Sequence, residues 1–335
     1  MGLESHYRGK NVLITGGLGF IGSNLAIRLV EYGACVTLID SLIPEYGGNL
    51  YNVEPIKDIV NINFSDVRDE HSMKYLVKNQ DFLFNLAGQT SHLDSMKDPF
   101  TDLEINAKAQ LFILEACRWH NPDIRIVFAS TRQIYGVPRY LPVDEHHPLS
   151  PIDVNGINKM AGEWYHIVYH KVYGIRSSVL RLTNTYGPRM RVKDARQTFI
   201  GIWIRRLIEE KPILVYGDGL QRRDFNFIDD VVDALVMAAP DERAHGQICN
   251  LGADDPISLK DTAELMIRIH GKGTYQVVPF PKDRKVIDIG DYYGNYGMFS
   301  STLGWKPHVT LEEGLRTTIE YYQEQSSYYW NENDD

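Results

Sequence analysis

A glycine-rich loop between an apolar run and an amphipathic run limits most strongly how this chain can fold. The loop reads Thr15-Gly-Gly-Leu-Gly-Phe-Ile-Gly22, and it joins the strand-like segment 11–15 to the helix-like segment 20–32. Gly16, Gly19 and Gly22 are spaced for a tight turn, a close approach of the backbone to a ligand, and close packing of helix on strand. The loop therefore predicts a strand–turn–helix unit that opens a parallel sheet.

The pattern that begins with this loop continues through the first 180 or so residues. Strand-like runs cover 11–15, 35–40, 58–62, 82–87, 124–130 and 176–182, and helix-like runs cover 20–32, 69–79, 99–120 and 156–173. Strands that alternate with helices require crossover connections. We therefore predict an α/β fold with a Rossmann-type doubly wound parallel sheet and a smaller α/β substrate-binding lobe.

The pattern changes near residue 185 to shorter strands, more Pro and Gly, and helices predicted near 195–210, 229–239, 259–270 and 311–325. We assign residues 1–184 to the Rossmann domain, with segments near 220–255 as candidates to rejoin it. Residues 185–325 form the predicted lobe. The polar tail 326–335 is expected to fray.

Composition excludes several classes of protein. The formal charge of −9 argues against a nucleic-acid partner or an anionic membrane. There is no apolar signal core at the N-terminus and no apolar run long enough to span a bilayer, so no membrane association is expected. Cys35, Cys117 and Cys249 are too few and scattered for a disulfide framework or a zinc cluster, which fits a cytoplasmic protein. His166 and His170 lack a third ligand at recognisable spacing, so no metal is expected.

The glycine loop and the strand after it predict a dinucleotide site. The N–H groups of the loop and the positive end of the following helix suit a pyrophosphate, with Phe20 and Ile21 at the start of that helix. The second strand ends at Asp40, 18 residues beyond Gly22 and next to Ser41. An acidic residue there binds the adenosine ribose and repels a 2′-phosphate, which favours NAD over NADP.

The loop has two residues between its first two glycines, and in this it resembles the extended short-chain dehydrogenase/reductase superfamily, in particular the nucleotide-sugar epimerases and dehydratases. The resemblance covers nearly the whole chain, with further matches at Phe128-Ala-Ser130, Arg181-Leu-Thr-Asn184, Arg223-Asp-Phe-Asn-Phe-Ile-Asp-Asp230 and Gly304-Trp-Lys-Pro307. It implies NAD contacts at Asp66, Val67, Leu86, Ala87, Gly88 and Lys159.

The resemblance also implies a catalytic tyrosine and a lysine four residues later, and here one of the two differs. Lys159 matches the lysine, but Asn155 occupies the tyrosine position, and its amide does not titrate near neutral pH. Lys159 itself, or a water held by Asn155, ranks first as the replacement base; Asp153 and Tyr135 border the site in the family and are further candidates. The alternative is that the site performs no redox step.

The segment Ser130-Thr-Arg-Gln133 limits which reactions of the family this chain can catalyse. Sugar 4,6-dehydratases of the family carry an Asp-Glu pair after the threonine, whereas Arg132 and Gln133 cannot shuttle protons. Elimination is therefore disfavoured. The Thr131 side chain is suited to form a hydrogen bond with a sugar hydroxyl. Arg132 either pairs with an anionic substituent such as a uronate or is a surface arginine.

The remaining expectations concern substrate and assembly. The resemblance implies substrate contacts, including two arginines that clamp a diphosphate, at Gln89, Asn184, Tyr216, Arg223 and Arg284. Ser91, His92 and Asp94 are too close in sequence for a hydrolytic triad, and Ser91 and His92 are expected to border the sugar pocket. Residues at helical spacing in 156–173 are interpreted as core packing, and the family implies a homodimer through helices near 99–120 and 156–173.

The prediction is thus an NAD-dependent epimerase that acts through a transient keto-sugar on a nucleoside-diphosphate sugar. Two alternatives stay open. One is a catalytically impaired protein that binds nucleotide sugar and NAD. The other is a dehydratase, decarboxylase or oxidoreductase with non-standard acid and base residues.

Overall fold

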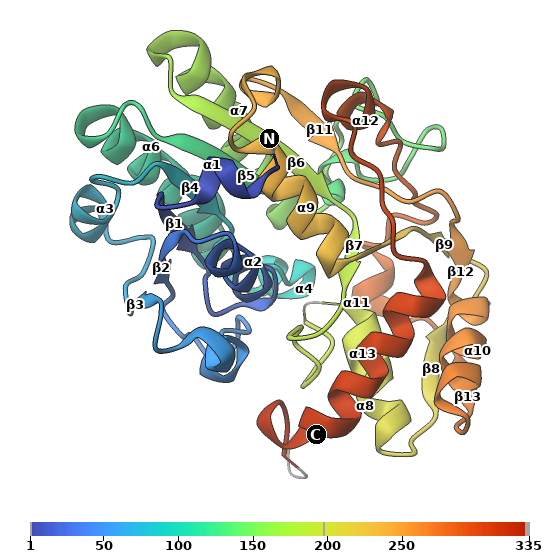
Figure 1. Ribbon diagram of the computed structural model, residues 1–335. Coiled ribbons are helices and arrows are strands. Elements are labelled where there is room, and N and C mark those ends of the chain that lie inside the picture. The colour runs from blue at the N-terminus through green and yellow to red at the C-terminus, as the bar shows by residue number, and fades with distance from the viewer. Residues whose placement is uncertain (1, 197, 332–335) are drawn as a thin grey trace.

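The computed structural model describes residues 2–196 and 198–331. At its centre lies a seven-stranded sheet in the order β11-β6-β5-β4-β1-β2-β3, with every neighbouring pair parallel (Figure 1). The strands are β1 (Asn11–Thr15), β2 (Cys35–Ile39), β3 (Asn61–Asn63), β4 (Phe82–Asn85), β5 (Arg125–Thr131), β6 (Arg176–Leu182) and β11 (Ile248–Asn250). This confirms the predicted doubly wound parallel sheet.

Both faces of the sheet are buried, because alternate residues of each strand enter different cores. Val12 and Ile14 lie in a core with α2 (Phe20–Glu31) and α9 (Ile228–Ala238). Leu13, between them, lies in a second core with α3 (Glu70–Leu76) and α6 (Ala109–His120). The period of two along a strand explains why these strands read as continuous apolar runs.

Several predicted boundaries are corrected. The segment 99–120 is three consecutive helical pieces, α5 (Pro99–Leu103), a π-helical turn over Glu104–Lys108, and α6. The predicted strand 58–62 is displaced to β3, a short edge strand that pairs through its backbone and so needs little apolar character. In contrast, α7 (Val154–Tyr173) starts earlier than predicted because the Asp153 carboxylate accepts a hydrogen bond from Gly156 N at 2.7 Å.

A second group of elements lies to one side of the sheet (Figure 1). Its strands pair two by two, β7 with β10, β8 with β13 and β9 with β12. The elements are β7 (Asn184–Tyr186), α8 (Phe199–Ile208), β8 (Ile213–Tyr216), β9 (Arg222–Arg223), β10 (Phe225–Phe227), β12 (Ile257–Ser258), α10 (Leu259–His270), β13 (Tyr275–Val278), α11 (Lys282–Lys285), α12 (Gly297–Leu303) and α13 (Leu311–Gln325). The short helices α1 (Glu4–Tyr7) and α4 (His92–Lys97) complete the described α-helices.

The expectation that the tail frays is wrong for its first residues. The ring of Tyr328 stacks on Tyr51 with centroids 3.8 Å apart, and the Tyr329 hydroxyl donates to Asn52 Oδ1 at 2.8 Å. Aromatic side chains, which the polar composition of the tail obscured, fix this segment against the short helix Leu50–Ile56. The last four tail positions, 332–335, lie outside the described residues.

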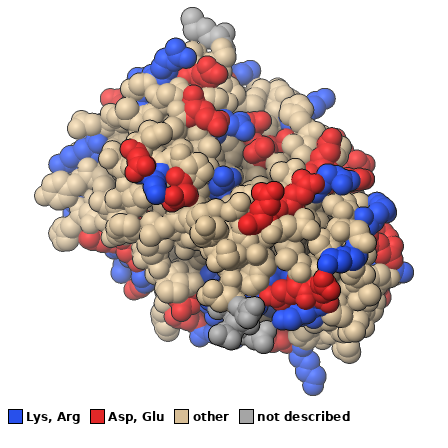
Figure 2. All heavy atoms as spheres, turned by 60° about the horizontal axis from the view of Figure 1, so that its bottom comes forward, with Lys and Arg blue, Asp and Glu red and all other residues tan. Residues whose placement is uncertain are grey.

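The surface shows charges of both signs. On the face in Figure 2, Lys and Arg side chains alternate with Asp and Glu. Among the helices of the described chain, none combines the length and apolar character that crossing a membrane requires.

Candidate active site

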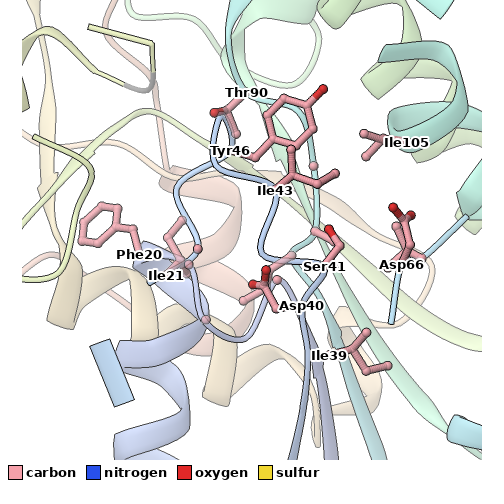
Figure 3. A pocket seen from close by; sticks show the side chains of 18 of the residues that line it. Phe20, Ile21, Ile39, Asp40, Ser41, Ile43, Tyr46, Asp66, Thr90 and Ile105 are labelled. Carbon is pink, nitrogen blue, oxygen red and sulfur yellow. The ribbon is translucent and has the colours of Figure 1, made fainter. Parts of the chain in front are cut away.

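A hollow of about 790 Å³ lies at the carboxyl ends of β1, β2 and β4. Figure 3 shows side chains from several separate segments gathered around it. Every predicted cofactor residue except Lys159 lines it, namely Gly16, Gly19, Phe20, Ile21, Gly22, Asp40, Ser41, Asp66, Val67, Leu86, Ala87 and Gly88. This is the edge of a parallel sheet at which dinucleotides bind.

The glycines of the loop occupy positions where a side chain would collide. A Cβ on Gly22 would lie 2.2 Å from Gly16 O, and one on Gly16, which has a φ of +68°, would lie 3.0 Å from Ala87 N. The first turn of α2 therefore packs directly on the loop, with Gly19 as its N-cap residue. The exposed N–H groups of this turn give the hollow the donors that a pyrophosphate needs.

Two carboxylates lie in the hollow at different depths. Asp40 accepts hydrogen bonds from Leu18 N at 3.1 Å and Leu42 N at 2.9 Å, while burial raises its pKa. Burial would also raise the pKa of Asp66, but hydrogen bonds from Arg68 outweigh it and the pKa is lowered. Both side chains are thus held in place, and Asp40 keeps spare acceptor capacity for ribose hydroxyls.

Sequence reasoning missed part of the lining of the hollow, and most clearly the loop after β2, which contributes Ile43, Tyr46 and Gly48. The other additional lining residues are Ile39, Ser65, Thr90 and Ile105. A Cβ on Gly48 would meet Asp40 Oδ1 at 2.8 Å, so the pair Gly47-Gly48 was the available signal that this loop folds back onto the strand end.

Lys159 lies beside the hollow without lining it. Its Nζ donates to Ala129 O at 3.1 Å, and a Cβ on Gly88 would lie 3.0 Å from that Nζ. The side chain is buried, and burial lowers the pKa of Lys159 to about 8 although Asp102 and Glu163 oppose the shift. Burial thus shifts this amine toward its neutral form, of which a minor fraction is present near physiological pH.

Asn155 belongs to a buried polar network that the sequence did not reveal. Its Nδ2 donates to Gln89 O at 2.7 Å and to Asp102 Oδ2 at 3.1 Å. Asn106 donates to the same two acceptors at 2.9 and 3.0 Å, and Asn158 donates to Asp102 Oδ1 at 2.8 Å. Asp102 is fully buried, so three amides satisfy a carboxylate that no water reaches.

This network fixes how the Asn155 amide is turned. A carbonyl oxygen and a carboxylate only accept hydrogen bonds, so the nitrogen of Asn155 must face Gln89 and Asp102. Its Oδ1 then points away from both and accepts no hydrogen bond from any described residue. The available signal was Asp102 and Asn106 four apart on one helical face, with Asn155 and Asn158 three apart on another.

Thr131 and Gln133, at and just after the end of β5, differ in their hydrogen-bond partners. The hydroxyl of Thr131, which is partly exposed, accepts from Gln133 N at 3.2 Å. Gln133 Nε2 donates to Asp153 Oδ2 at 2.8 Å, and His92 Nδ1 lies 3.1 Å from the same oxygen. Asp153 is thus committed to capping α7 and to these partners.

The surroundings of Tyr135 argue against its being the base that accepts the proton. The residue is fully buried. Its hydroxyl donates to Asn250 Oδ1 at 2.7 Å and accepts from Arg181 Nη1 at 2.7 Å. Burial raises the pKa of Tyr135 to about 12. The tyrosinate is therefore scarce near neutral pH, and the hydroxyl is used inside the fold.

The predicted substrate residues Asn184, Arg223, Arg284, Tyr216 and Gln89 fall into three places. Arg223 is buried, donates to Arg222 O and Gly290 O, and lies 3.6 Å from Asp288 Oδ1. Asn184 Nδ2 donates to Asp224 O, next in sequence to Arg223, at 2.9 Å. Arg284 lies elsewhere, with its Cζ 6.0 Å from the centre of the Tyr216 ring. Gln89 is buried beside the cofactor hollow, where its carbonyl joins the Asn155 network.

His166 and His170, at which no metal site is expected, contact groups of the fold. His166 is fully buried against Phe128 and shares a hydrogen bond with Ser177, and burial lowers its pKa to about 3. His170 Nδ1 lies 3.0 Å from Ile175 O. In the described residues, no group of three or more His, Cys, Asp and Glu side chains is placed to hold a metal ion. Ser91 caps α4 by accepting from Asp94 N at 3.1 Å.

Comparisons with known proteins agree with this site. The model of the NAD dependent epimerase/dehydratase family matches residues 12–252. A UDP-N-acetyl-alpha-D-glucosaminuronate decarboxylase of Bacillus cytotoxicus is 32% identical over 94% of this chain and 98% of its own length. A UDP-glucose 4-epimerase of Mycolicibacterium smegmatis is 30% identical over 94% of this chain and 99% of its own.

A solved structure extends the similarity to three dimensions. The Thermus thermophilus UDP-glucose 4-epimerase in complex with NAD superposes with a TM-score of 0.83 at 29% identity, over 93% of this chain and 99% of that one. The chain belongs to the NAD-dependent epimerase/dehydratase family of the extended short-chain dehydrogenase/reductases, and its cofactor is NAD.

Proposed function

We propose that the protein is an epimerase that acts on a nucleoside-diphosphate sugar through a transient keto-sugar. The observation that carries the proposal is the end of β5, where Thr131 is followed by a cation and an amide, Arg132 and Gln133. Neither can take a carbon-bound proton and expel water, so oxidation at a hydroxyl followed by return of the hydride is the chemistry that these residues support.

The residues around Lys159 suit that chemistry. NAD bound in the hollow would supply a reversible hydride acceptor. The Thr131 hydroxyl donates a hydrogen bond to the oxygen of the reacting hydroxyl, and the proton of that hydroxyl passes to the neutral amine of Lys159 or to a water that donates a hydrogen bond to the Oδ1 of Asn155. Since the amide of Asn155 cannot titrate, it orients the group that takes the proton and does not accept the proton itself.

The substrate's diphosphate meets the cations of the second group of elements. Arg223 and Arg284 clamp it, Asn184 approaches it from the other side, and Tyr216 lies next to the nucleotide base. Gln89 borders the sugar. These assignments follow the similarity to proteins named as acting on UDP-sugars.

The protein acts as a homodimer in this proposal. The interpretation of the α7 residues as core packing is wrong for several of them, since Ile157 is 49%, Trp164 48%, Val168 46% and Val172 63% exposed. Phe100 on α5 is 76% exposed. Apolar side chains of this size on one helix need a covering surface, and a second copy of the same helices supplies it. A cytoplasmic location fits Cys117 and Cys249, which are buried free thiols.

The test is product analysis with UDP-glucose, UDP-N-acetylglucosamine and UDP-glucuronate. A product of unchanged mass and inverted configuration at one carbon, seen by mass spectrometry and NMR, is expected for one of them. Loss of water or of carbon dioxide would assign a dehydratase or a decarboxylase instead. If no sugar reduces bound NAD in a single turnover, the protein is the catalytically impaired alternative.

A further inference from the structure

Arg132 carries a permanent positive charge that the fold leaves without a hydrogen bond. It follows Thr131 directly, at the start of the short helix Arg132–Tyr135. Its Nε is buried and has no partner, and its guanidinium makes no hydrogen bond to any residue in 2–196 or 198–331. The Cζ lies 5.6 Å from the centre of the buried Tyr292 ring, which holds the side chain in place. Arg132 is therefore half-buried, with an enclosed Nε, and is not a fully exposed surface arginine.

The acidic groups near Arg132 are committed elsewhere. Asp224 accepts from the Thr183 hydroxyl and from Gly294 N at 2.9 Å. Asp153 caps α7 and accepts from Gln133. Their charges offset part of the cost of burying the guanidinium, but none of its five N–H donors is satisfied by them.

The third nearby carboxylate, Asp288, is also engaged. It accepts from Gln221 Nε2 and lies 3.6 Å from Arg223 Nη2. Arg223 is itself close enough for the charge of Arg132 to add to burial in lowering its pKa to about 10. The guanidinium groups of half-buried Arg132 and buried Arg223 repel each other, which favours an anion beside Arg132.

The position of Arg132 indicates which part of a substrate supplies that anion. It lies one residue from Thr131 and near Asp153, the residue that caps the helix bearing Asn155 and Lys159. The reacting hydroxyl must lie at this end, beside the cofactor hollow. Of the two arginines proposed above for the diphosphate, Arg223 lies close enough to Arg132 for their charges to interact, whereas Arg284 lies near the Tyr216 ring.

We infer that the substrate is an acidic sugar nucleotide and that Arg132 binds the carboxylate of its sugar. The inference rests on the proposed function, because it assigns the sugar end of that same site. Arg is suited to the task, since its planar fork matches a carboxylate in a bidentate geometry. An uncharged hexose would leave the buried Nε donor of Arg132 unpaired.

Binding to the NAD-loaded, full-length protein tests this directly. Isothermal titration with UDP, UDP-glucose and UDP-glucuronate should show UDP-glucuronate binding at least tenfold more tightly than UDP-glucose, or about 1.4 kcal/mol. Arg132→Gln should abolish that preference while leaving the affinities for UDP and UDP-glucose within about threefold. Arg132→Lys should retain part of it, because the charge remains. Arg139→Gln, a change at a nearby exposed arginine, should preserve all three affinities.

The outcomes separate this inference from the proposed function. Equal wild-type affinity for UDP-glucose and UDP-glucuronate would overturn the inference and leave the epimerase proposal standing. An equal loss of affinity for all three ligands in Arg132→Gln would show that Arg132 holds the diphosphate, which also overturns it. If the wild-type protein binds none of the three, the nucleotide-sugar function fails and the inference fails with it.

Discussion

Replacing Lys159 tests whether this amine takes the proton that a tyrosine accepts in related enzymes. With the pKa lowered to about 8 by burial, about a tenth of the amine is neutral at pH 7 and about half at pH 8. If the neutral amine is the base, the rate of the redox step rises about fivefold between these two values and less than about twofold further up to pH 9. The positive charge of the nicotinamide can only move this rise to lower pH.

The assay is single-turnover reduction of bound NAD by the active nucleotide sugar, followed by absorbance across the pH range. Lys159→Arg keeps the charge but cannot act as a base, so the rise with pH should vanish and the rate should fall by about 10² or more. A rate that instead falls as the pH passes 8 would show that the cationic form is needed, and the base would then be a water or another group.

Measuring the free energy of unfolding shows whether a Lys159 variant loses activity because it no longer folds. Between about pH 8 and 10.5 the unfolded chain holds the Lys159 proton while the folded chain does not, so the free energy of unfolding rises with pH in this window. Below pH 8 the buried charge costs the folded state about 3 kcal/mol. Lys159→Met removes that cost and should be at least as stable as wild type at neutral pH in urea unfolding, while remaining inactive.

Three further predictions follow from contacts in the structure. Gly22→Ala places a Cβ 2.2 Å from Gly16 O and should abolish retention of NAD, measured on cofactor released by denaturation; full occupancy would mean that the loop can relax. Asp102→Asn replaces an acceptor of three amides with one that also donates, and should lower the free energy of unfolding by about 3 kcal/mol; an unchanged urea midpoint would contradict this. Trp164→Glu combined with Val168→Glu should turn a dimer into a monomer in sedimentation, and a dimer that persists would locate the interface elsewhere.

The cofactor hollow could be predicted because its residues occupy the ends of consecutive parallel strands. Gly16 and Asp40 directly follow a strand, Gly88 comes three residues after the end of β4, and the order of strands in a doubly wound sheet brings such ends together. Tyr46 reaches the hollow through a loop that folds back, and no local pattern specifies that path. The apolar spacing of α7 indicated a covered face but not what covers it, so Trp164 was assigned to the core although 48% of it is exposed.

The sequence alone shows that Asn155 departs from the tyrosine of the family, but the contact that explains an asparagine there joins distant segments of the chain. Asp102 comes 53 residues earlier, in a helix where a buried carboxylate has no local explanation. A tyrosine at position 155 has a single O–H donor, and a tyrosinate base has none, so Asn106 would then have to serve both Gln89 O and Asp102 Oδ2. Reverting this one residue would therefore leave a buried charge short of a donor, at a cost that cancels much of what a tyrosinate base contributes. The amides at 106, 155 and 158 and the carboxylate at 102 form one hydrogen-bonded unit, and in the proposed mechanism this unit supplies a neutral amide and no base. That is why the route of the proton has to be sought at Lys159 and the solvent next to it.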